Sequence, residues 1–479
     1  MKAGFAERDI TPAVGMERPG GYSKRFVERT HDPLKVRAAV FDDGAGVAAL
    51  VGVDTCIIGR ATVELARAEI DRLSDVPGGS VMIGASHTHT GGPLFGFLAE
   101  RFDDAPKLIR GLAVEHSVVV DPEYHRHVAR QIASAVIEAY NTRETVRLSV
   151  GAGFEDAAVF NRRFVMTDGR TVTHPGKGNP EIVEAAGPID PQVGVIAAWR
   201  GDDSLLGCVV NYACHGTTAP GNATSADWIG YMDSTIRGVM GPRVVTVFLN
   251  GACGDITQVD NRTTTEREFG YAYSRLVGTR VGAEAVKVMV TAPKGRCHPV
   301  RVKSKMLKLD RRRPDPASLA RCRKTVTLDP STRDDETEWT FAKERLIADW
   351  LAETEPTVEV EVQAVQVGPA VLVANPSEFF CSLGLDIRHR STFPHTFVVE
   401  LANGGCGYVP DREAFGERGG GYETVLTSYS NLETEAGPKI VDASVALSEK
   451  LKPGRVPGRK KVSFSGTPWG YGVLGPELD

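Results

Sequence analysis

The 479-residue sequence lacks the features that direct a protein into a membrane or onto nucleic acid. Its longest smooth apolar stretch, near Gly44–Val53, falls well short of the about 20 residues that a membrane-spanning helix needs. Met1–Arg25 holds no apolar core, so we expect no secretory signal, no stable membrane insertion and a cytoplasmic location. Basic residues total 56 against 61 acidic ones, and this net charge of −5 gives no reason to expect a nucleic-acid partner.

The cysteines lack the spacing of a thiolate metal site. Eight cysteines are spread over the chain, and no two of them form a Cys-x-x-Cys pair. This absence argues against a thiolate zinc knuckle or a thioredoxin-type motif, so we expect buried, reduced thiols. Histidine is also scarce, with 11 residues, and histidines that lie close together are therefore candidates for chemistry.

Apolar strands and helices alternate along most of the chain. This alternation predicts an α/β fold, a mixed β-sheet domain with flanking helices. Strands are expected at Leu34–Phe41, Gly46–Asp54, Ser80–Ala85, Gly194–Trp199, Leu205–Tyr212, Arg243–Leu249, Thr357–Val367, Ala370–Ala374 and Thr396–Ala402. Helices are expected at Arg60–Leu73, Pro122–Tyr140, Ala226–Met240, Glu266–Val290 and near Lys439–Leu451.

The segment Asp310–Glu353 differs from the rest of the chain. It opens with Arg311-Arg-Arg-Pro314 and continues with many charges at weak helical periodicity. This pattern is typical of solvated helices, so we predict a charged helical insertion over 310–355, with a lid or an oligomer contact as alternatives. The remaining sequence predicts one domain over 1–455 and an irregular tail over 456–479.

His87 and His89 lie in a loop that follows a predicted strand. Residues two apart on extended backbone point to the same side, so these two imidazoles can share one face. Such a pair begins many metal sites, although hydrogen-bonded histidines give the same pattern. His125 and His127 are also two apart, but they fall on a predicted helix that splays them by about 200° and excludes a shared metal.

Two further polar residues follow predicted strands. His215 comes after Leu205–Tyr212 in a loop of Cys, Gly, Thr and Pro, where it either caps backbone groups or enters a site. Glu378 comes after the apolar run Ala370–Ala374, where it either complements the start of a helix or points into a site. Ligands of α/β proteins bind beyond the carboxyl ends of strands, so these loops are the first candidates.

Three other candidate residues each allow two interpretations. Tyr408 and Tyr422 lie near the glycine run Gly419–Gly421, where aromatic residues either line a substrate pocket or pack. Cys253 is either a nucleophile with a nearby histidine as its base or a buried thiol. The loop around it lacks the Gly-Lys-Ser/Thr ending of a phosphate loop, which excludes that motif.

Taken in order, short motifs of this sequence resemble the neutral (non-lysosomal) ceramidase family. The match runs from the start of the chain to about Leu451. The motifs are Gly4-Phe-Ala-Glu-Arg-Asp9-Ile-Thr-Pro12, Ser86-His-Thr-His-Thr-Gly-Gly92, Asn161-Arg162, Ile189-Asp-Pro191, Asn211-Tyr-Ala-Cys-His215, Ser225-Ala-Asp-Trp228, Asn250 to Thr257, Pro376-Ser-Glu378 and Gly407-Tyr-Val-Pro410.

The resemblance implies a single zinc ion in an α/β catalytic domain. The ligands that it implies are His87, His215, Glu378 and Tyr408. Two imidazoles and a carboxylate leave a coordination position open, as catalytic zinc requires. The resemblance also implies that His89 carries a proton or donates to an oxyanion, and that Arg162 and Tyr422 hold polar groups of the substrate.

Thr257 departs from the family pattern. The family's serine-bearing motif is Gly-Asp-Val-Ser-Pro-Asn, whereas this sequence reads Gly254-Asp-Ile-Thr-Gln-Val259, so Thr257 takes the place of the serine. The additional methyl group of threonine stiffens the side chain and crowds an attack. We therefore expect activated water, rather than Thr257, to be the attacking group.

Together these features predict a zinc-dependent hydrolase that cleaves an amide or ester bond of a polar small molecule. Polar side chains on the candidate loops, including Arg162, Asn403, Arg412 and Glu413, suit a polar substrate better than a lipid. One alternative is a true ceramidase (N-acylsphingosine amidohydrolase) that uses Thr257 in place of serine. Another is a non-catalytic binding protein of the same fold. Whether the chain forms a homo-oligomer is left open.

Overall fold

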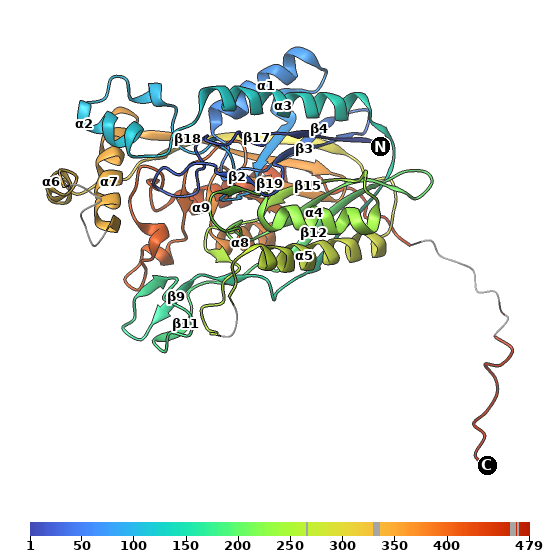
Figure 1. Cartoon of the computed structure of the whole chain (residues 1–479). Coiled ribbons are helices and arrows are strands. Elements are labelled where there is room, and N and C mark those ends of the chain that lie inside the picture. Colours follow the sequence, from blue (N-terminus) through green and yellow to red (C-terminus); the bar gives the residue numbers. More distant parts are fainter. Residues whose placement is uncertain (265–266, 329–335, 460–465, 467–468) are drawn as a thin grey trace.

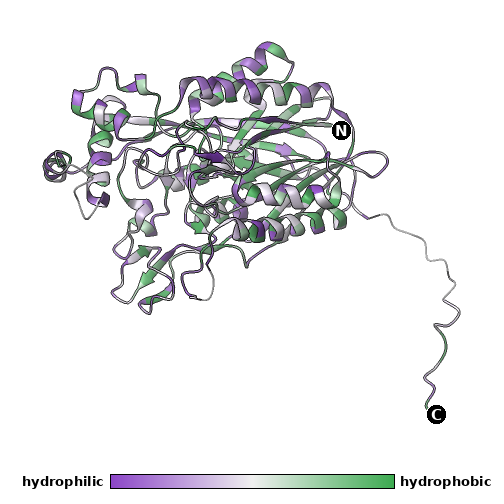
Figure 2. Cartoon of the chain, viewed as in Figure 1, coloured by the Kyte–Doolittle hydropathy of each residue, from purple (hydrophilic) through white to green (hydrophobic). Residues whose placement is uncertain are grey.

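The computed structural model describes residues 1–264, 267–328, 336–459, 466 and 469–479. In this part of the chain, strands form a central block and helices cover it on two opposite sides (Figure 1). Hydrophobic residues concentrate on the strands and on the helix faces turned toward them (Figure 2). The structure confirms the predicted α/β fold with mixed sheets.

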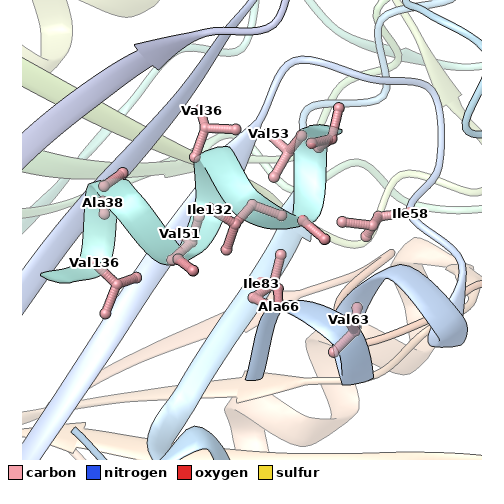
Figure 3. Packing of buried hydrophobic residues seen from close by; sticks show 14 of the residues in the cluster. Val36, Ala38, Val51, Val53, Ile58, Val63, Ala66, Ile83, Ile132 and Val136 are labelled. Atoms are coloured by element: carbon pink, nitrogen blue, oxygen red, sulfur yellow. The ribbon is translucent and has the colours of Figure 1, made fainter. Parts of the chain in front are cut away.

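The first sheet has the strand order β5-β4-β3-β1-β6, and helices α1 and α3 cover its outer face. Its elements are β1 (Lys2–Asp9), β3 (Lys35–Asp42), β4 (Val47–Val53), β5 (Val81–Ala85), β6 (Glu144–Thr145), α1 (Arg60–Leu73) and α3 (Pro122–Asn141). Val36, Val51 and Ile83 of the sheet pack against the two helices (Figure 3). The helices contribute Val63 and Ile132 to the same cluster. Alternate residues face the other side and are also buried, which explains the continuous apolar runs in the sequence.

The second sheet has the strand order β15-β13-β12-β7, with α4 and α5 on its outer face. Its elements are β7 (Arg147–Phe154), β12 (Gln192–Trp199), β13 (Leu205–Tyr212), β15 (Val245–Asn250), α4 (Asp227–Met240) and α5 (Tyr271–Thr291). Helix α5 begins later than the sequence predicts. Gly270, directly before it, has φ +103°, a left-handed conformation that a helix does not continue through. The predicted start at Glu266 lies outside the described residues.

The third sheet has the strand order β17-β18-β19-β21 and packs on α8 and α9. Its elements are β17 (Val300–Asp310), β18 (Thr357–Val367), β19 (Ala370–Ala374), β21 (His395–Val399), α8 (Cys381–Arg390) and α9 (Ala436–Glu449). The hairpin of β18 and β19 turns at Gly368, whose φ of +58° suits a glycine. The two strands have the bounds that the sequence predicted, Thr357–Val367 and Ala370–Ala374.

The inner faces of the three sheets share one core. Phe41 of β3, Ile196 of β12 and Leu372 of β19 belong to the same buried cluster. Each sheet also contains one parallel pair of strands: β4 with β5, β13 with β15, and β19 with β21. The carboxyl ends of parallel neighbours lie at the same edge of a sheet, so the loops that follow them are placed to form a common site.

Short strands tie the connecting loops together. A parallel pair joins β20 (Glu378–Phe379) to β22 (Tyr408–Val409), and an antiparallel pair joins β8 (Phe160–Asn161) to β16 (Ile256–Thr257). The remaining short strands are β2 (Arg29–Thr30), β9 (Arg163–Met166), β10 (Thr171–Thr173), β11 (Ile182–Ala185) and β14 (Ala223–Thr224). These pairings hold residues that are distant in sequence against one another.

The predicted insertion contains α6 (Pro316–Thr325) and α7 (Glu336–Thr354). Helix α7 is not a solvated helix, and this part of the prediction is wrong. Its residues Trp339, Leu346 and Leu351 are buried against Phe102 and Leu112 of the segment that contains α2 (Lys107–Arg110). The apolar periodicity of α7 is weak because its buried face also carries charged side chains.

In the described residues, no helix is both long and apolar enough to cross a membrane. The described residues of 456–479 contain no helix or strand, and Figure 1 shows this end of the chain leading away from the sheets. The division into a domain over 1–455 and a tail stays a prediction.

Candidate metal centre

The candidate centre lies where the loops after the parallel strand pairs meet. His87 follows β5, His215 follows β13, and Glu378 lies in β20 shortly after β19. The first two loops are joined directly, because the backbone N–H of His89 donates to the carbonyl of Gly216 at 2.9 Å. Side chains that are separated by up to 291 residues in the sequence therefore share one buried site.

Three ligand-type atoms converge in this centre. Nε2 of His87 lies 3.2 Å and Nε2 of His215 lies 3.3 Å from Oε2 of Glu378. All three side chains are buried, and among the described residues no donor hydrogen-bonds Glu378 Oε2. A buried carboxylate oxygen beside two imidazole nitrogens needs a cation, either a proton on an imidazole or a metal ion. The donor set therefore fits a metal.

Each of the two candidate imidazoles is oriented by a group next to its Nδ1. Nδ1 of His87 lies 2.8 Å from the backbone oxygen of Cys56, which can only accept, so Nδ1 carries the hydrogen and Nε2 offers a lone pair. Nδ1 of His215 lies 3.5 Å from Sγ of Cys253. Metal-binding histidines are oriented in this way by a hydrogen-bond partner of the ring nitrogen that does not bind the metal. His87 also adopts φ +64°, a strained conformation that is common at functional sites.

The charges of this cluster shift its pKa values in different directions. Burial raises the pKa of Glu378, but His87 and His215 outweigh burial and hold the pKa well below its usual range. Burial lowers the pKa of His87, yet Glu378 outweighs it and raises that pKa well above its usual value. Burial, Arg162 and His87 together keep the pKa of His215 well below its usual value. Glu378 is thus ionised and His215 neutral, which are the metal-binding forms, whereas a metal ion would take the place of the proton that Glu378 favours on Nε2 of His87.

A second combination of ligand types shares His87 with the first. Ligand atoms of Cys56, His87 and His89 also lie within 4.8 Å of one another. However, the Cys56 thiol lies 3.9 Å from Nδ1 of His87, the nitrogen that the backbone of Cys56 already occupies. The group with Glu378 is the better metal site, because it joins two imidazoles to a carboxylate on the open side of the rings.

His89 faces the same centre. Its Nδ1 donates to the carbonyl of Gly20 at 3.0 Å, and its Nε2 lies 3.3 Å from Nε2 of His87. Burial and the adjacent His87 lower the pKa of His89 to about 3, so this imidazole is neutral. The Nε2 lone pair of His89 therefore faces Nε2 of His87 inside the cluster.

Arg162 brings a buried positive charge next to the centre. Its Nη1 lies 3.2 Å from Nε2 of His215, and its Nη2 donates to the carbonyl of Gly254 at 2.8 Å. Its Nε donates to the buried carboxylate of Glu423 at 2.7 Å. The guanidinium also lies over the ring of Tyr408, 5.4 Å from its centroid. Arg162 is thus held rigidly with one edge toward the candidate ligands.

Three tyrosines surround Glu378. The hydroxyl of Tyr429 donates to Oε1 of Glu378 at 2.8 Å. The ring of Tyr408 lies 5.5 Å from that of Tyr422 and 6.1 Å from that of Tyr429. Burial and the nearby Glu378 charge raise the pKa of Tyr408 well above its usual value. Tyr422 is 37% exposed and forms the outer side of this group.

In the described part of the chain, Thr257 forms no hydrogen bond with the candidate ligands. It lies in β16, where it pairs with Phe160, and its hydroxyl donates to the side-chain oxygen of Gln258 at 3.1 Å. The hydroxyl of Thr217 donates to the same oxygen at 3.0 Å. An amide oxygen is not a base, so these contacts do not activate Thr257 as a nucleophile.

Two of the expected pocket residues have other partners. The side-chain oxygen of the buried Asn403 accepts the backbone N–H of Ile83 at 3.0 Å. The guanidinium of Arg412 pairs with Glu435 at the surface, with Nε 3.0 Å from Oε1. The expectation that these two side chains offer free polar groups to a substrate is therefore wrong.

The sequence reasoning missed Glu400, a buried carboxylate that supports two of the candidate ligands. Its Oε1 accepts the thiol of Cys253 at 2.9 Å, and its Oε2 accepts the backbone N–H groups of Cys253 and Phe379 at 2.9 and 2.8 Å. Cys253 faces His215, and Phe379 adjoins Glu378. A lone glutamate directly after an apolar strand was the signal that could have identified it.

Cys253 connects Glu400 to His215 and does not have the properties of a nucleophile. Burial and Glu400 raise the pKa of the Cys253 thiol well above its usual value, whereas nucleophilic cysteines have lowered pKa values. We expect Cys253→Ala to weaken zinc binding about tenfold, because His215 loses the thiol that lies next to its Nδ1. Competition with a chromophoric chelator measures this affinity.

The matched control is Cys208→Ala, which removes an equally buried thiol from β13. It should lower the thermal stability to a similar degree and leave zinc affinity unchanged. Cys253→Ser keeps a hydroxyl at this position and should lie between the alanine variant and the wild type. Equal zinc affinity in Cys253→Ala and the wild type would show that the thiol does not position His215.

The comparisons with known proteins agree with this architecture. Neither a protein-family model nor a curated protein matches the sequence. A solved ceramidase complexed with C2 aligns with 96% of this chain and 77% of its own, at a TM-score of 0.69 and 18% identity. The neutral ceramidase from Pseudomonas aeruginosa aligns with 96% and 76%, at a TM-score of 0.68 and 18% identity. The fold is that of a neutral ceramidase.

The neutral ceramidase fold is what the short motifs of the sequence implied, and this part of the resemblance is confirmed. At 18% identity the similarity concerns the fold.

Proposed function

We propose that this chain of neutral ceramidase fold is a zinc-dependent hydrolase that cleaves an amide or ester bond of a polar small molecule. The supporting observation is the convergence of His87 Nε2 and His215 Nε2 on Glu378 Oε2, a buried oxygen without a hydrogen-bond donor among the described residues. Two imidazoles and a carboxylate form the protein part of many catalytic zinc sites.

His87, His215 and Glu378 would hold the zinc ion, with Tyr408 as a fourth group beside them. A bound zinc ion supplies Lewis-acid chemistry, since it polarises a carbonyl and lowers the pKa of water. Cys56 and Cys253 keep the Nδ1 sides of the two imidazoles occupied. The chain thus presents both Nε2 lone pairs and one carboxylate oxygen to the same point.

Hydrolysis adds the hydroxyl of water to the acyl carbon and a proton to the departing nitrogen or oxygen. Arg162 is placed to donate to the oxygen that becomes negative in this reaction, because its guanidinium is buried and its edge faces His215. His89 offers a neutral Nε2 that can accept a hydrogen bond from the reacting groups and so orient them. Tyr422 lies at the outer side, where its hydroxyl can hold a polar group of the substrate.

The side chains around the candidate centre suit a polar substrate better than a long acyl chain. Arg162, Tyr408, His89 and Tyr422 lie around the centre, and all of them carry hydrogen-bonding atoms. Each such group that is left unpaired against an apolar chain costs about 1–3 kcal/mol. Helix α7 also brings Phe341 to within 5.9 and 6.5 Å of the rings of Tyr22 and Tyr422, which narrows the approach.

The proposal is tested by a substrate screen with the zinc-loaded protein. We expect short N-acyl or O-acyl polar compounds to be hydrolysed with a kcat/KM at least about tenfold above that of a detergent-solubilised long-chain ceramide, a difference of about 1.4 kcal/mol in transition-state binding. The reverse preference would overturn the polar-substrate part and favour a true ceramidase. The neutral ceramidase fold is the observation that favours this second candidate.

Absence of turnover on every amide and ester, with zinc bound, would favour the third candidate, a binding protein of the same fold. The rigid placement of Arg162 beside the centre argues against this candidate, because a buried cation aimed at candidate metal ligands is expensive to keep without a role.

Thr257→Ala should keep most of the turnover. Among the described residues, the hydrogen-bond partner of its hydroxyl is the Gln258 side-chain oxygen, which cannot take up a proton from it, so we expect an attack that does not depend on Thr257. We expect kcat/KM to fall by less than about tenfold, and Thr257→Ser to raise it little. A loss as deep as that of a ligand variant, or an acyl group trapped on Thr257, would contradict this expectation.

A further inference from the structure

A cavity of about 480 Å³ lies outside the candidate centre. We call it the outer cavity and define it by Arg18, Tyr22, Arg25, Glu336, Phe341 and Tyr422. One wall comes from the N-terminal loop that carries the two arginines, and the opposite wall comes from helix α7 of the insertion. The volume is sufficient for part of a small molecule.

The outer cavity is separated from the centre by one layer of side chains. The ring of Tyr422 lines the cavity and also lies 5.5 Å from the ring of Tyr408. Its hydroxyl lies 3.2 Å from that of Tyr22. On the same wall, Nη1 of Arg18 donates to the backbone oxygen of His89 at 2.6 Å. A molecule in the cavity thus lies next to the residues that flank the candidate ligands.

Among the described residues, the two guanidinium groups of this cavity have no ion-pair partner. Arg18 is only 7% exposed, and among the described residues its Nε has no hydrogen-bond partner. No ion pair of Arg18 or Arg25 exists in the same part of the chain. Glu336 is the carboxylate among the described lining residues, and the nearby Glu28 accepts a hydrogen bond from the Asn222 side chain instead.

The positive charge of Arg18 is therefore poorly compensated. Burial lowers its pKa, and the neighbouring Arg25 lowers it further, while Glu28 acts in the opposite direction. An anion in the cavity would offset the repulsion between the two arginines that line it. Guanidinium groups bind carboxylates with paired, charge-assisted hydrogen bonds, and Arg does so better than Lys.

We infer that the outer cavity binds a carboxylate group of the substrate, held by Arg18 and Arg25. The inference rests on the proposed function and narrows its substrate class to acyl amides or esters that carry a carboxylate near the scissile bond. Tyr22 and Tyr422 lie between this carboxylate and the centre, so the remainder of the substrate must run past their rings or replace the 3.2 Å contact between their hydroxyls. A ceramide is uncharged and leaves both arginines without a partner.

The test compares carboxylate substrates with their carboxamide counterparts on the zinc-loaded protein. The panel contains an N-acetyl amino acid, with the carboxylate on the leaving amine, and an N-succinyl amine, with the carboxylate on the acyl group. At least one carboxylate should show a kcat/KM about tenfold above that of its carboxamide. This preference should fall to about twofold or less in Arg25→Gln, mainly through KM, and Arg25→Lys should restore part of it.

Arg72→Gln is the matched control, because it removes an exposed arginine from α1, outside the outer cavity. It should keep the full preference for the carboxylate. An equal rate on carboxylate and carboxamide in the wild type would overturn the inference, and so would an unchanged preference in Arg25→Gln.

A binding measurement separates failure of the inference from failure of the proposed function. Calorimetry with N-acetylglycine and N-acetylglycinamide, used as probes at low salt, requires no turnover. We expect the carboxylate probe to bind at least about tenfold more tightly than the amide, and less tightly as the salt concentration rises. Tight carboxylate binding without hydrolysis would support the subsite and reject the hydrolase, whereas equal binding of both probes would reject the subsite.

Discussion

Replacing His215 with alanine should leave the protein without its metal. The wild type should hold about one zinc per chain, and His215→Ala should lose affinity by more than the about 10–100-fold that removal of a supporting group costs. The physical reason is that Glu378 Oε2 and His87 Nε2 would then face each other without the second imidazole, and two protein ligands bind zinc weakly. Metal content after dialysis against a chelator measures this.

His125→Ala is the control for this measurement. His125 is a buried histidine of α3 whose Nδ1 lies 2.7 Å from the hydroxyl of Thr62, and it lies outside the centre. Its removal should cost stability without changing zinc content. If the wild type and His215→Ala hold equal zinc, the assignment of His215 as a ligand is wrong.

Replacing Arg162 with methionine should lower kcat/KM by about 100- to 1,000-fold while zinc stays bound. Arg162 brings the buried positive charge beside the candidate ligands, and loss of one such donor to a developing negative oxygen has an effect of this size. The zinc content should stay at the wild-type value, because Arg162 is not a ligand. Steady-state kinetics and metal analysis on the same sample test both statements.

A second variant separates this effect from a folding defect. Arg162→Met leaves the carboxylate of Glu423 buried and without its 2.7 Å partner, which is destabilising by itself. The double variant Arg162→Met/Glu423→Gln removes that charge and should regain stability but not activity. Recovery of activity in the double variant would show that Arg162 acts only by pairing with Glu423.

The helices and strands followed from the sequence where their packing is regular. Strands such as Leu205–Tyr212 are buried on both faces, and α1 has apolar residues at helical spacing, so local pattern and tertiary packing agree. The many charges of helix α7 predicted a solvated helix, because the hydrogen-bond partners of its buried charges come from distant parts of the chain. The ammonium of the buried Lys343 donates to the carbonyls of Tyr22 and His116 at 3.0 and 2.9 Å. Nothing local in the sequence reveals such acceptors.

The candidate centre was predictable in its members but not in its support. His87, His215 and Glu378 were candidates because each follows a predicted strand, and the family resemblance implied them as one set. The topology of three parallel pairs brings them together. The interpretation of Glu378 as a helix cap is wrong, because the residue at the start of α8 is Phe380. Tyr429 and Glu400 escaped notice, since their partners lie 51 and 147 residues away along the chain.

The distinction between a polar and a lipid substrate depended on which loop residues face the site. The sequence placed Asn403 and Arg412 near glycines and therefore near the presumed pocket. Their side chains instead bond to Ile83 and Glu435, respectively. The arginines that line a cavity next to the centre, Arg18 and Arg25, come from the N-terminal loop, which no local pattern connected with the histidines.

The most direct measurement is a zinc titration of the metal-free protein, in which bound metal and hydrolysis of the best substrate from the screen are followed together. The account predicts negligible turnover without metal and a linear rise that saturates at about one zinc per chain, as one site of two imidazoles and a carboxylate requires. Full turnover after complete removal of metal, or saturation of zinc binding with no dependence of turnover on it, would contradict the account.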